Sequence, residues 1–180
     1  MENVFNVFKD NSRRVFKWES LGDIKHGREA LGEEMPVIVY RLMQFTLHDA
    51  LSLELGMEKA NDLFRVAGHM AGKEFAKNVL NLKLDFDGFI SHLQEALKTL
   101  KIGILRMEFF NPEDGQMVLT VAEDLDCSGL PVTNESVCVY DEGFISGILE
   151  VYTGKKYEVR ETDCWATGDR VCRFKANPTA

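Results

Sequence analysis

The spacing of apolar residues changes near Gly103, and this change limits the fold more than any other feature of the sequence. Before Gly103, apolar residues recur at the three- and four-residue spacing that is typical of helices. After it, short apolar runs alternate with clusters of turn residues, a pattern typical of strands. Helices followed by strand pairs predict an α+β fold with an antiparallel sheet.

Three helices are predicted before the change of spacing. Residues 36–55 are densely apolar and begin with a proline that suits a first helical turn, and we expect this helix to be buried on most sides. Residues 57–80 place apolar and charged side chains on opposite faces, which predicts an amphipathic helix. A third helix begins near Asp85 or Asp87, either of which can cap it, and ends at Gly103.

The remaining sequence predicts two strand pairs and one inserted helix. Asparagine, proline and glycine in residues 111–115 indicate the turn of the first hairpin. We expect the N-terminal helices to pack on the antiparallel sheet, with the inserted helix and the final hairpin beside them. The predicted strands are residues 104–110, 117–121, 157–163 and 170–175, and the inserted helix is residues 137–152.

Two glycine pairs stand at helical spacing, Gly68-x-x-x-Gly72 and Gly143-x-x-x-Gly147. Glycine has no Cβ, so each pair allows another element to approach the helix closely. In a chain without a membrane span, this spacing is more typical of tight core packing than of a ligand cleft. We interpret both pairs as structural.

Length and charge exclude several classes of protein. A chain of 180 residues is expected to form one domain over residues 1–180, with residues 1–35 as an irregular, partly extended entry segment. Its formal net charge of −8 repels phosphate backbones, so we expect no direct nucleic-acid binding. No signal peptide or membrane span is apparent, which predicts a cytoplasmic protein without a membrane partner. Glu123 and Asp124 are expected at the solvated surface.

All four cysteines lie in the last third of the chain, at Cys127, Cys138, Cys164 and Cys172. If the final hairpin turns about Gly168, Cys164 and Cys172 lie opposite each other with Cβ atoms about 4.5–5.5 Å apart. Two thiolates so placed can share one tetrahedral metal ion, which suits zinc. Cys138 begins the inserted helix, where the backbone amides favour a thiolate.

The fourth ligand of such a site is either Cys127 or Glu161. An offset of three places Glu161 and Cys164 on opposite faces of a regular strand, so Glu161 needs a bulge to turn inward. Strand geometry therefore favours Cys127. The alternative interpretation is that all four cysteines are ordinary buried thiols, since the sequence lacks the CxxC pairs of a strong zinc motif.

The C-terminal sequence resembles the 4-vinyl reductase domain family. The resemblance rests on a cysteine before Gly143-x-x-x-Gly147, on Gly154-Lys155, and on Glu-Thr-Asp-Cys followed by Gly-Asp-Arg-Val-Cys-Arg-Phe over residues 161–174. It is strongest over residues 117–175. The resemblance implies a small α+β ligand-binding fold, usually dimeric, shared with sensor domains of phenol-responsive activators. In those sensors an aromatic ligand lies in a buried pocket beside a zinc ion.

The resemblance also assigns residues. By position it implies that Cys138, Glu161, Cys164 and Cys172 bind zinc, and we follow it, with Cys127 as the alternative fourth ligand. It places His92 roughly where the sensors have a polar pocket residue, so His92 is a candidate ligand-binding residue. The implied partners are a small apolar or aromatic ligand and a second copy of the chain.

We therefore expect a zinc-containing protein that binds a small hydrophobic or aromatic molecule, as a stand-alone sensor or accessory dimer. No dinucleotide fingerprint or catalytic triad appears, which argues against an enzyme. One alternative is an accessory protein or enzyme in tetrapyrrole (vinyl group) metabolism. Another is a purely structural dimerisation or scaffold protein, which predicts no cavity large enough for a ligand.

Overall fold

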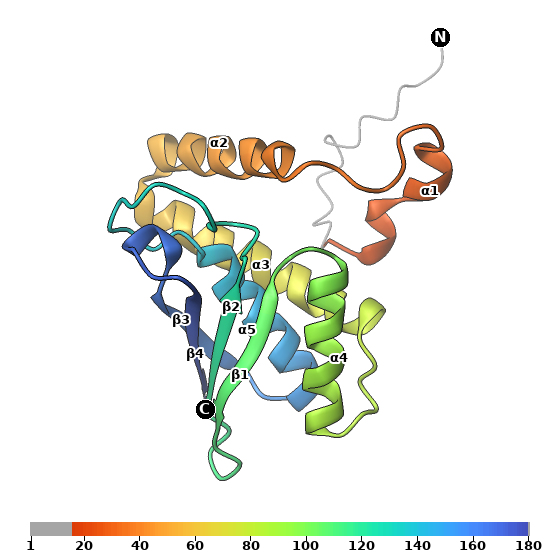
Figure 1. The fold of residues 1–180 in the computed structure, drawn as a ribbon, viewed down its shortest axis with the longest axis vertical. Coiled ribbons are helices and arrows are strands. Elements are labelled where there is room, and N and C mark those ends of the chain that lie inside the picture. The colour runs from red at the N-terminus through yellow and green to blue at the C-terminus, as the bar shows by residue number, and fades with distance from the viewer. Residues whose placement is uncertain (1–15, 180) are drawn as a thin grey trace.

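The computed structural model describes residues 16–179, which form helices followed by a sheet with one inserted helix (Figure 1). This order confirms the predicted α+β class. The helices are α1 (Ile24–Gly27), α2 (Val37–Leu55), α3 (Met57–Val79), α4 (Phe86–Thr99) and α5 (Val139–Thr153), with 3-10 turns at Trp18–Leu21 and Trp165–Thr167. The strands are β1 (Ile104–Phe110), β2 (Met117–Ala122), β3 (Tyr157–Asp163) and β4 (Cys172–Pro178).

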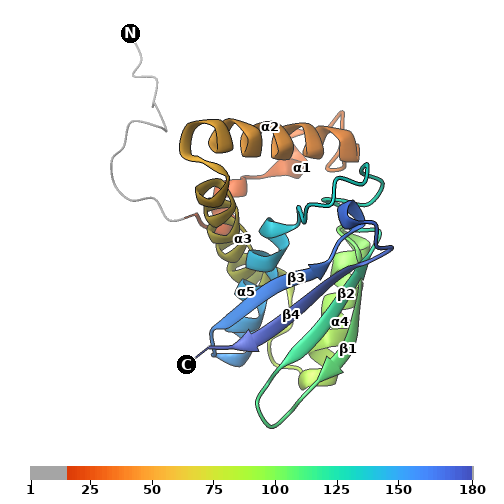
Figure 2. The same ribbon diagram turned by 90° about the vertical axis from the view of Figure 1, so that its left-hand side faces the viewer.

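The four strands form one antiparallel sheet in the order β1-β2-β4-β3. Both predicted hairpins are present, and β2 pairs with β4 at the centre. Leu119 and Phe174 face inward and are buried, whereas Arg106 and Lys175 are exposed on the other face. Helices α4 and α5 cover the inner face, as Figure 2 shows. The core therefore lies between these two helices and the sheet.

Helices α3 and α5 cross at the two glycine pairs. A Cβ added to Gly143 would lie 2.0 Å from the backbone oxygen of Arg65, and one added to Gly68 would lie 2.0 Å from the backbone oxygen of Tyr140. A Cβ added to Gly72 or Gly147 would lie 2.1 Å or 2.3 Å from the nearest backbone oxygen. The prediction that both pairs serve tight packing is confirmed, because the two backbones touch where no side chain would fit.

Helix α2 departs from its prediction. We expected it to be buried on most sides, but Gln44 is its only buried residue. Its large apolar side chains point outward, and Leu53 is 87% exposed. The prediction is wrong because apolar density alone does not show which face of a helix has a partner. The exposed set, called here the outward face of α2, is Val37, Ile38, Val39, Leu42, Met43, Leu47, Leu53 and Leu55.

Helix α4 ends earlier than the sequence suggested. Asp85 caps its start by accepting a hydrogen bond from the N–H of Gly88 at 3.0 Å. Its end is at Thr99, because Lys101 adopts a positive φ of 59° and Ile102 N–H returns to the carbonyl of Leu97. This Schellman geometry ends the helix without a glycine.

The entry segment contains short helical turns where the sequence predicted irregular, partly extended chain. Residues 18–21 and 24–27 form these turns, whereas residues 1–15 of the predicted segment lie outside the described residues. No helix within residues 16–179 combines the length and the hydropathy that crossing a membrane requires.

Candidate functional site

The four cysteines converge at one end of the sheet, although they come from four separate places in the chain. Cys127 lies in the loop after β2, Cys138 precedes the first turn of α5, Cys164 follows β3, and Cys172 opens β4. All four are buried, and their sulfur atoms lie within 4.8 Å of one another. We call this group the cysteine cluster.

The spacing of the sulfur atoms suits a tetrahedral metal ion. The sulfur of Cys138 lies 3.8 Å from that of Cys164 and 3.8 Å from that of Cys172. Four sulfurs each about 2.3 Å from a zinc ion lie about 3.8 Å apart, so these two distances agree with that geometry. Cys127 and Cys172 are closer, at 3.0 Å. The cluster could thus hold a metal ion after a small movement of Cys127.

The close thiols also alter one another's acidity. Hydrogen bonds from Cys127 and the other thiols lower the pKa of Cys164, whereas the same kind of contact raises the pKa of Cys138. The group therefore favours a thiolate at Cys164, and thiolates are the form that binds metals.

Glu161 lies beside the cluster, because β3 bulges between Glu161 and Asp163. The bulge removes the geometric objection to an inward Glu161, since the extra residue brings positions 161 and 164 to the same side. Its Oε2 accepts a hydrogen bond from the N–H of Cys138 at 3.4 Å, and its Oε1 is buried without a partner. Burial, together with the charge of Cys164, raises the pKa of Glu161 to about 8.

The loop after β2 adds two acidic side chains that the sequence analysis missed. Asp124 was expected at the solvated surface, but it is 4% exposed, so that prediction is wrong. Its Oδ1 accepts hydrogen bonds from the N–H groups of Asp126, at 2.8 Å, and Cys127, at 3.2 Å. Burial raises the pKa of both carboxyls, that of Asp126 to about 7 with the charge of Asp124 as a second cause. Nothing in the sequence around Asp124 and Asp126 indicated that these side chains would be buried.

Helix α2 anchors this loop through its polar side chains. The Tyr40 hydroxyl donates to Asp126 Oδ1 at 2.8 Å. Arg41 donates to the carbonyl oxygens of Leu125 at 2.8 Å and Ser128 at 2.9 Å. The polar face of α2 therefore points into the protein, where it holds the loop that carries Cys127.

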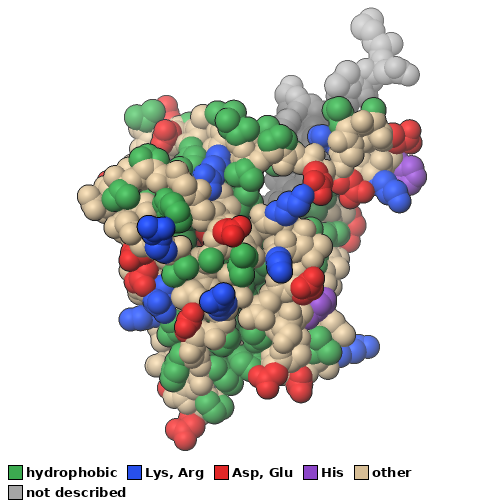
Figure 3. Space-filling view, viewed as in Figure 1, with side chains coloured by type: hydrophobic (Ala, Val, Ile, Leu, Met, Phe, Trp, Pro, Cys, Tyr) green, Lys and Arg blue, Asp and Glu red, His purple; other side chains and the backbone are tan. Residues whose placement is uncertain are grey.

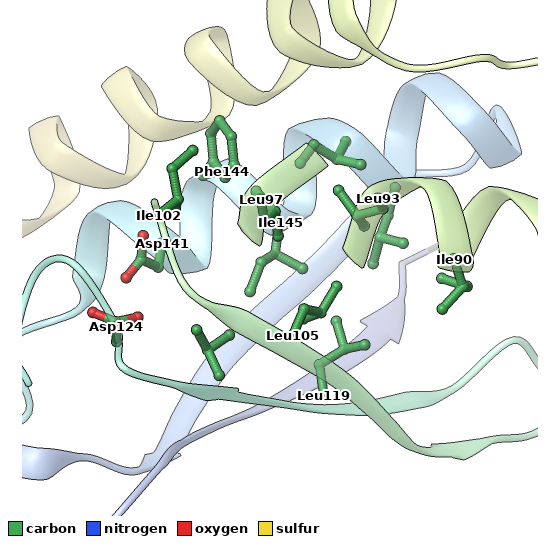
Figure 4. Close-up of a pocket in the computed structure, with 13 residues that line it drawn as sticks. Ile90, Leu93, Leu97, Ile102, Leu105, Leu119, Asp124, Asp141, Phe144 and Ile145 are labelled. Atoms are coloured by element: carbon green, nitrogen blue, oxygen red, sulfur yellow. The ribbon is translucent and has the colours of Figure 1, made fainter. Parts of the chain in front are cut away.

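An apolar cavity lies next to the cysteine cluster, between α4, α5 and the first two strands (Figure 4). Its volume is about 30 Å³. Asp124 and Asp141 stand at one end, and Ile90 stands at the other. Burial and the charges of Asp126 and Asp124 raise the pKa of Asp141 well above its usual range. The lining residues are Ile90, Leu93, Leu97, Ile102, Leu105, Leu119, Val121, Asp124, Asp141, Phe144, Ile145, Ile148 and Leu149.

His92 is not among the residues that line this cavity. It lies on α4, and its Nδ1 accepts a hydrogen bond from the N–H of Asn81 at 3.1 Å. That contact joins α4 to the preceding loop. The predicted ligand-binding role of His92 stays a prediction.

Comparison with known proteins agrees with the resemblance seen in the sequence. The V4R domain family matches residues 117–178. The uncharacterized protein MJ1642 of Methanocaldococcus jannaschii is 29% identical over 147 residues, which cover 82% of this chain and 80% of the relative.

Solved structures share the fold at low sequence identity. A vinyl-4-reductase family protein from Methanocaldococcus jannaschii superposes with a TM-score of 0.58 at 17% identity, over 83% of this chain and 85% of that one. The phenol-responsive sensory domain of the transcription activator PoxR, solved with phenol, gives a TM-score of 0.59 at 19% identity, over 82% and 76% of the two chains.

Proposed function

We propose that the protein binds a small apolar molecule next to a zinc ion, starting from the match of residues 117–178 to the V4R domain family. One observation carries the proposal: the apolar cavity and the cysteine cluster share a wall. Asp124 lines the cavity, and its Oδ1 lies 3.9 Å from the sulfur of Cys138. A ligand that contacts Asp124 therefore changes the surroundings of the metal, as a sensor requires.

The proposed zinc ligands are Cys138, Cys164 and Cys172, with Cys127 as the fourth. The closeness of all four sulfurs supports this set. Glu161 is the fourth ligand that the resemblance implies, and its buried, unpartnered Oε1 supports it as the competing choice. Zinc bound there would tie the final hairpin to the loop after β2 and contribute directly to folding. A closed site of four protein ligands leaves no position for substrate, which favours a structural role over catalysis.

Metal analysis tests both the ion and its ligands. Protein purified without added zinc is expected to contain stoichiometric zinc by mass spectrometry. Cys172→Ser is expected to lose the metal and to lower the melting temperature, because a ligand of the folded state is gone. Unchanged zinc content and stability in that variant would refute the site.

A pair of variants separates the two candidates for the fourth position. Cys127→Ser is expected to weaken zinc binding strongly, while Glu161→Gln retains it. Cobalt substitution gives a second measurement, since four thiolates and three thiolates with a carboxylate differ in absorption. Glu158→Gln is the matched control, because Glu158 is exposed on the same strand. The reverse order of zinc loss would assign the position to Glu161.

The cavity volume bears on ligand size. About 30 Å³ is well below the ~150 Å³ of an engineered cavity that binds benzene. In this conformation the cavity therefore has room for about two water-sized groups, and an aliphatic or aromatic ligand requires its walls to move apart. The same small volume favours a second candidate function, a structural dimerisation protein in which the cavity is a packing defect.

Methyl NMR distinguishes these two functions. Titration with small apolar molecules is expected to shift the methyl resonances of Ile90 and Ile145, which line the cavity. The methyl group of Ile38 on the outward face of α2 is the control for non-specific binding. If the cavity methyls do not respond to any probe, the structural candidate is favoured.

We further propose that the protein is a homodimer that pairs through the outward face of α2. Figure 3 shows hydrophobic side chains along this helix at the top of the view. A contiguous exposed apolar face typically marks an interaction surface. A second copy is the proposed occupant because one helix supplies a self-complementary apolar strip, as a two-fold interface requires.

Sedimentation analysis of Leu42→Glu tests the dimer. A carboxylate on this face is expected to dissociate the dimer, because it would be buried without a partner. Leu100→Glu is the matched control, since Leu100 is 52% exposed near the end of α4, close to the 60% of Leu42. A wild-type monomer, or loss of the dimer in both variants, would contradict the α2 interface.

A further inference from the structure

A groove separate from the apolar cavity lies between α2, α3 and the segment that leads into α5. We call it the α2–α3 groove. Its volume is about 430 Å³, whereas the apolar cavity measures about 30 Å³. Pockets that hold organic ligands typically measure about 300–1,000 Å³, so this groove has the size of a ligand site. Figure 2 shows α2 above α3 and the loop before α5.

Aromatic side chains supply much of the apolar wall of the groove. Phe45 on α2 is half-buried, and Phe64 on α3 is buried. The ring of His48 meets the ring of Phe64 at 87°, with the two centroids 5.0 Å apart. His48 Nε2 donates a hydrogen bond to Asn61 Oδ1 at 2.7 Å, since an amide oxygen can only accept. These contacts hold the rings in place, and aromatic rings bind both flat apolar groups and cations.

The charged side chains of the groove are all acidic. Asp49 on α2 and Glu135 in the segment before α5 are exposed and line it. No lysine or arginine is among the described residues that line the groove. Neither carboxylate is among the groups that gather at the cysteine cluster. The groove therefore combines an apolar aromatic wall with two negative charges of its own.

Gln44 adds an independent observation on the buried side of the groove. It lines the groove and is only 8% exposed. Its Oε1 is buried without a hydrogen-bond partner among the described residues. A buried acceptor without a donor is costly, and native proteins contain few of them. This wall therefore favours a ligand that carries hydrogen-bond donors.

We propose that the α2–α3 groove binds an organic cation with an aromatic body. The aromatic body lies against Phe45 and Phe64, and the ammonium group lies near Asp49 and Glu135. An N–H group of the aromatic body pairs with Gln44 Oε1 once the amide turns toward the groove. Because the two carboxylates are exposed, the ammonium group stays partly hydrated and each ion pair contributes modestly.

Other occupants fit the groove less well. An anion is repelled by both carboxylates, and a neutral aromatic molecule gains nothing from them. An aliphatic cation keeps the charge contacts but loses the contacts with the rings. A second copy of the chain on the outward face of α2 leaves the groove open, because none of the residues of that face lines it. We therefore expect an aromatic amine to rank first, the matching alcohol second and the matching acid last.

Three probes that share an indole ring test this order: tryptamine, tryptophol and indole-3-acetate, titrated into the full chain by calorimetry and methyl NMR. Tryptamine is expected to bind about fivefold more tightly than tryptophol at low salt, and about 0.5 M sodium chloride should remove most of that difference. Tryptamine is expected to shift the methyl resonance of Met57, which lines the groove, and not that of Ile145, which lines the apolar cavity. Equal affinity for tryptamine and tryptophol, no shift at Met57, or shifts at Ile145 alone would overturn the proposal.

A double variant, Asp49→Asn with Glu135→Gln, connects the preference to the two carboxylates. Tryptamine affinity is expected to fall about fivefold, to that of tryptophol, while tryptophol affinity stays within about twofold. Glu54→Gln with Glu95→Gln is the matched control, because it removes two exposed carboxylates that do not line the groove. An equal loss in the control would show general attraction to an acidic chain and would overturn the site.

Ser136→Trp tests the location without changing any charge. Ser136 is exposed and lines the groove, so the new ring is expected to occupy it and to weaken tryptamine and tryptophol at least about tenfold. The melting temperature verifies that each variant is folded. Unchanged binding of both probes in folded Ser136→Trp would overturn the proposal.

Discussion

Helix α3 has two neighbouring helices, and they contact it in opposite ways. Against α5 the contact is backbone on backbone, where Gly143 meets Arg65 and Gly147 meets His69. Against α2 the contact is polar: His48 Nε2 lies 2.7 Å from the side-chain oxygen of Asn61. Most large apolar residues of α2 are exposed, although Phe45 and Leu51 are half-buried.

The difference is that the contact with α5 is closely packed, whereas α2 keeps large apolar side chains exposed. The α3–α5 crossing has no room for an added atom, so it is fully packed by residues of the same chain. Helix α2 packs its polar face against the protein and leaves its apolar face exposed, which reverses the usual arrangement of a surface helix. This exposed face is the surface over which we propose that a second copy of the chain packs.

Gly143→Ala is expected to have the largest effect, because its new Cβ would lie 2.0 Å from the backbone oxygen of Arg65. Backbone cannot move aside cheaply, so we expect the free energy of unfolding to fall by about 3 kcal/mol or more, measured in urea. Gly27→Ala is the control, since no atom lies within 4 Å of its added Cβ and its effect should stay within about 0.5 kcal/mol. Equal stability of the two variants would show that the crossing is looser than described.

Arg41→Met tests the polar contact of α2. The side chain donates to two backbone carbonyls of the loop that carries Cys127, and their loss should cost about 1–3 kcal/mol and weaken zinc retention. Arg28→Met is the control, because Arg28 is exposed and donates to the carbonyl oxygen of Gly32 within its own turn. A wild-type unfolding curve would mean that α2 does not fix the loop.

The pH dependence of stability tests the contacts of Glu150 on α5 with Lys73 and His69 on α3. Lys73 and, more weakly, His69 hold the pKa of Glu150 below its usual range. A lowered folded-state pKa stabilises the protein above the unfolded-state pKa, and that contribution disappears as pH falls through the folded value. Glu150→Gln should therefore cost under about 1 kcal/mol at pH 7 and approach zero cost below about pH 4. A cost that is independent of pH would contradict the ion pair.

Leu53→Ser is expected to have the smallest effect. Leu53 is 87% exposed on the outward face of α2, so its loss should change the stability of the monomer by less than about 0.5 kcal/mol. The measurement is a urea titration at a protein concentration below the dimer dissociation constant. A loss of about 2 kcal/mol would show that the outward face is packed within one chain.

Local pattern was enough to predict most elements. The strands over 104–110 and 157–163 have the predicted bounds, and α2 and α3 differ from prediction by one residue at an end. Periodicity, proline and glycine act within a few residues, so the sequence reports them directly. The end of α4 was missed because Lys101 replaced the expected glycine in its terminal turn.

The candidate site was only partly predictable. Clustering of the cysteines indicated a common site, and the bulge that brings Glu161 inward was named as a requirement before it was observed. Asp124 and Asp141 could not be found, because their burial depends on the loop after β2 meeting α5 and on α2 covering that loop. Such contacts join residues far apart in the chain, and no local spacing encodes them.

The sequence by itself predicted the order of helices and strands, close packing at both glycine pairs, and a common site for the cysteines. Tertiary structure alone decided which face of α2 turns inward, which carboxylates close the cavity, and how small that cavity is. The physical reason is that a period of apolar residues specifies that a helix has two faces, whereas the partner of each face is chosen by burial and hydrogen bonding with distant segments.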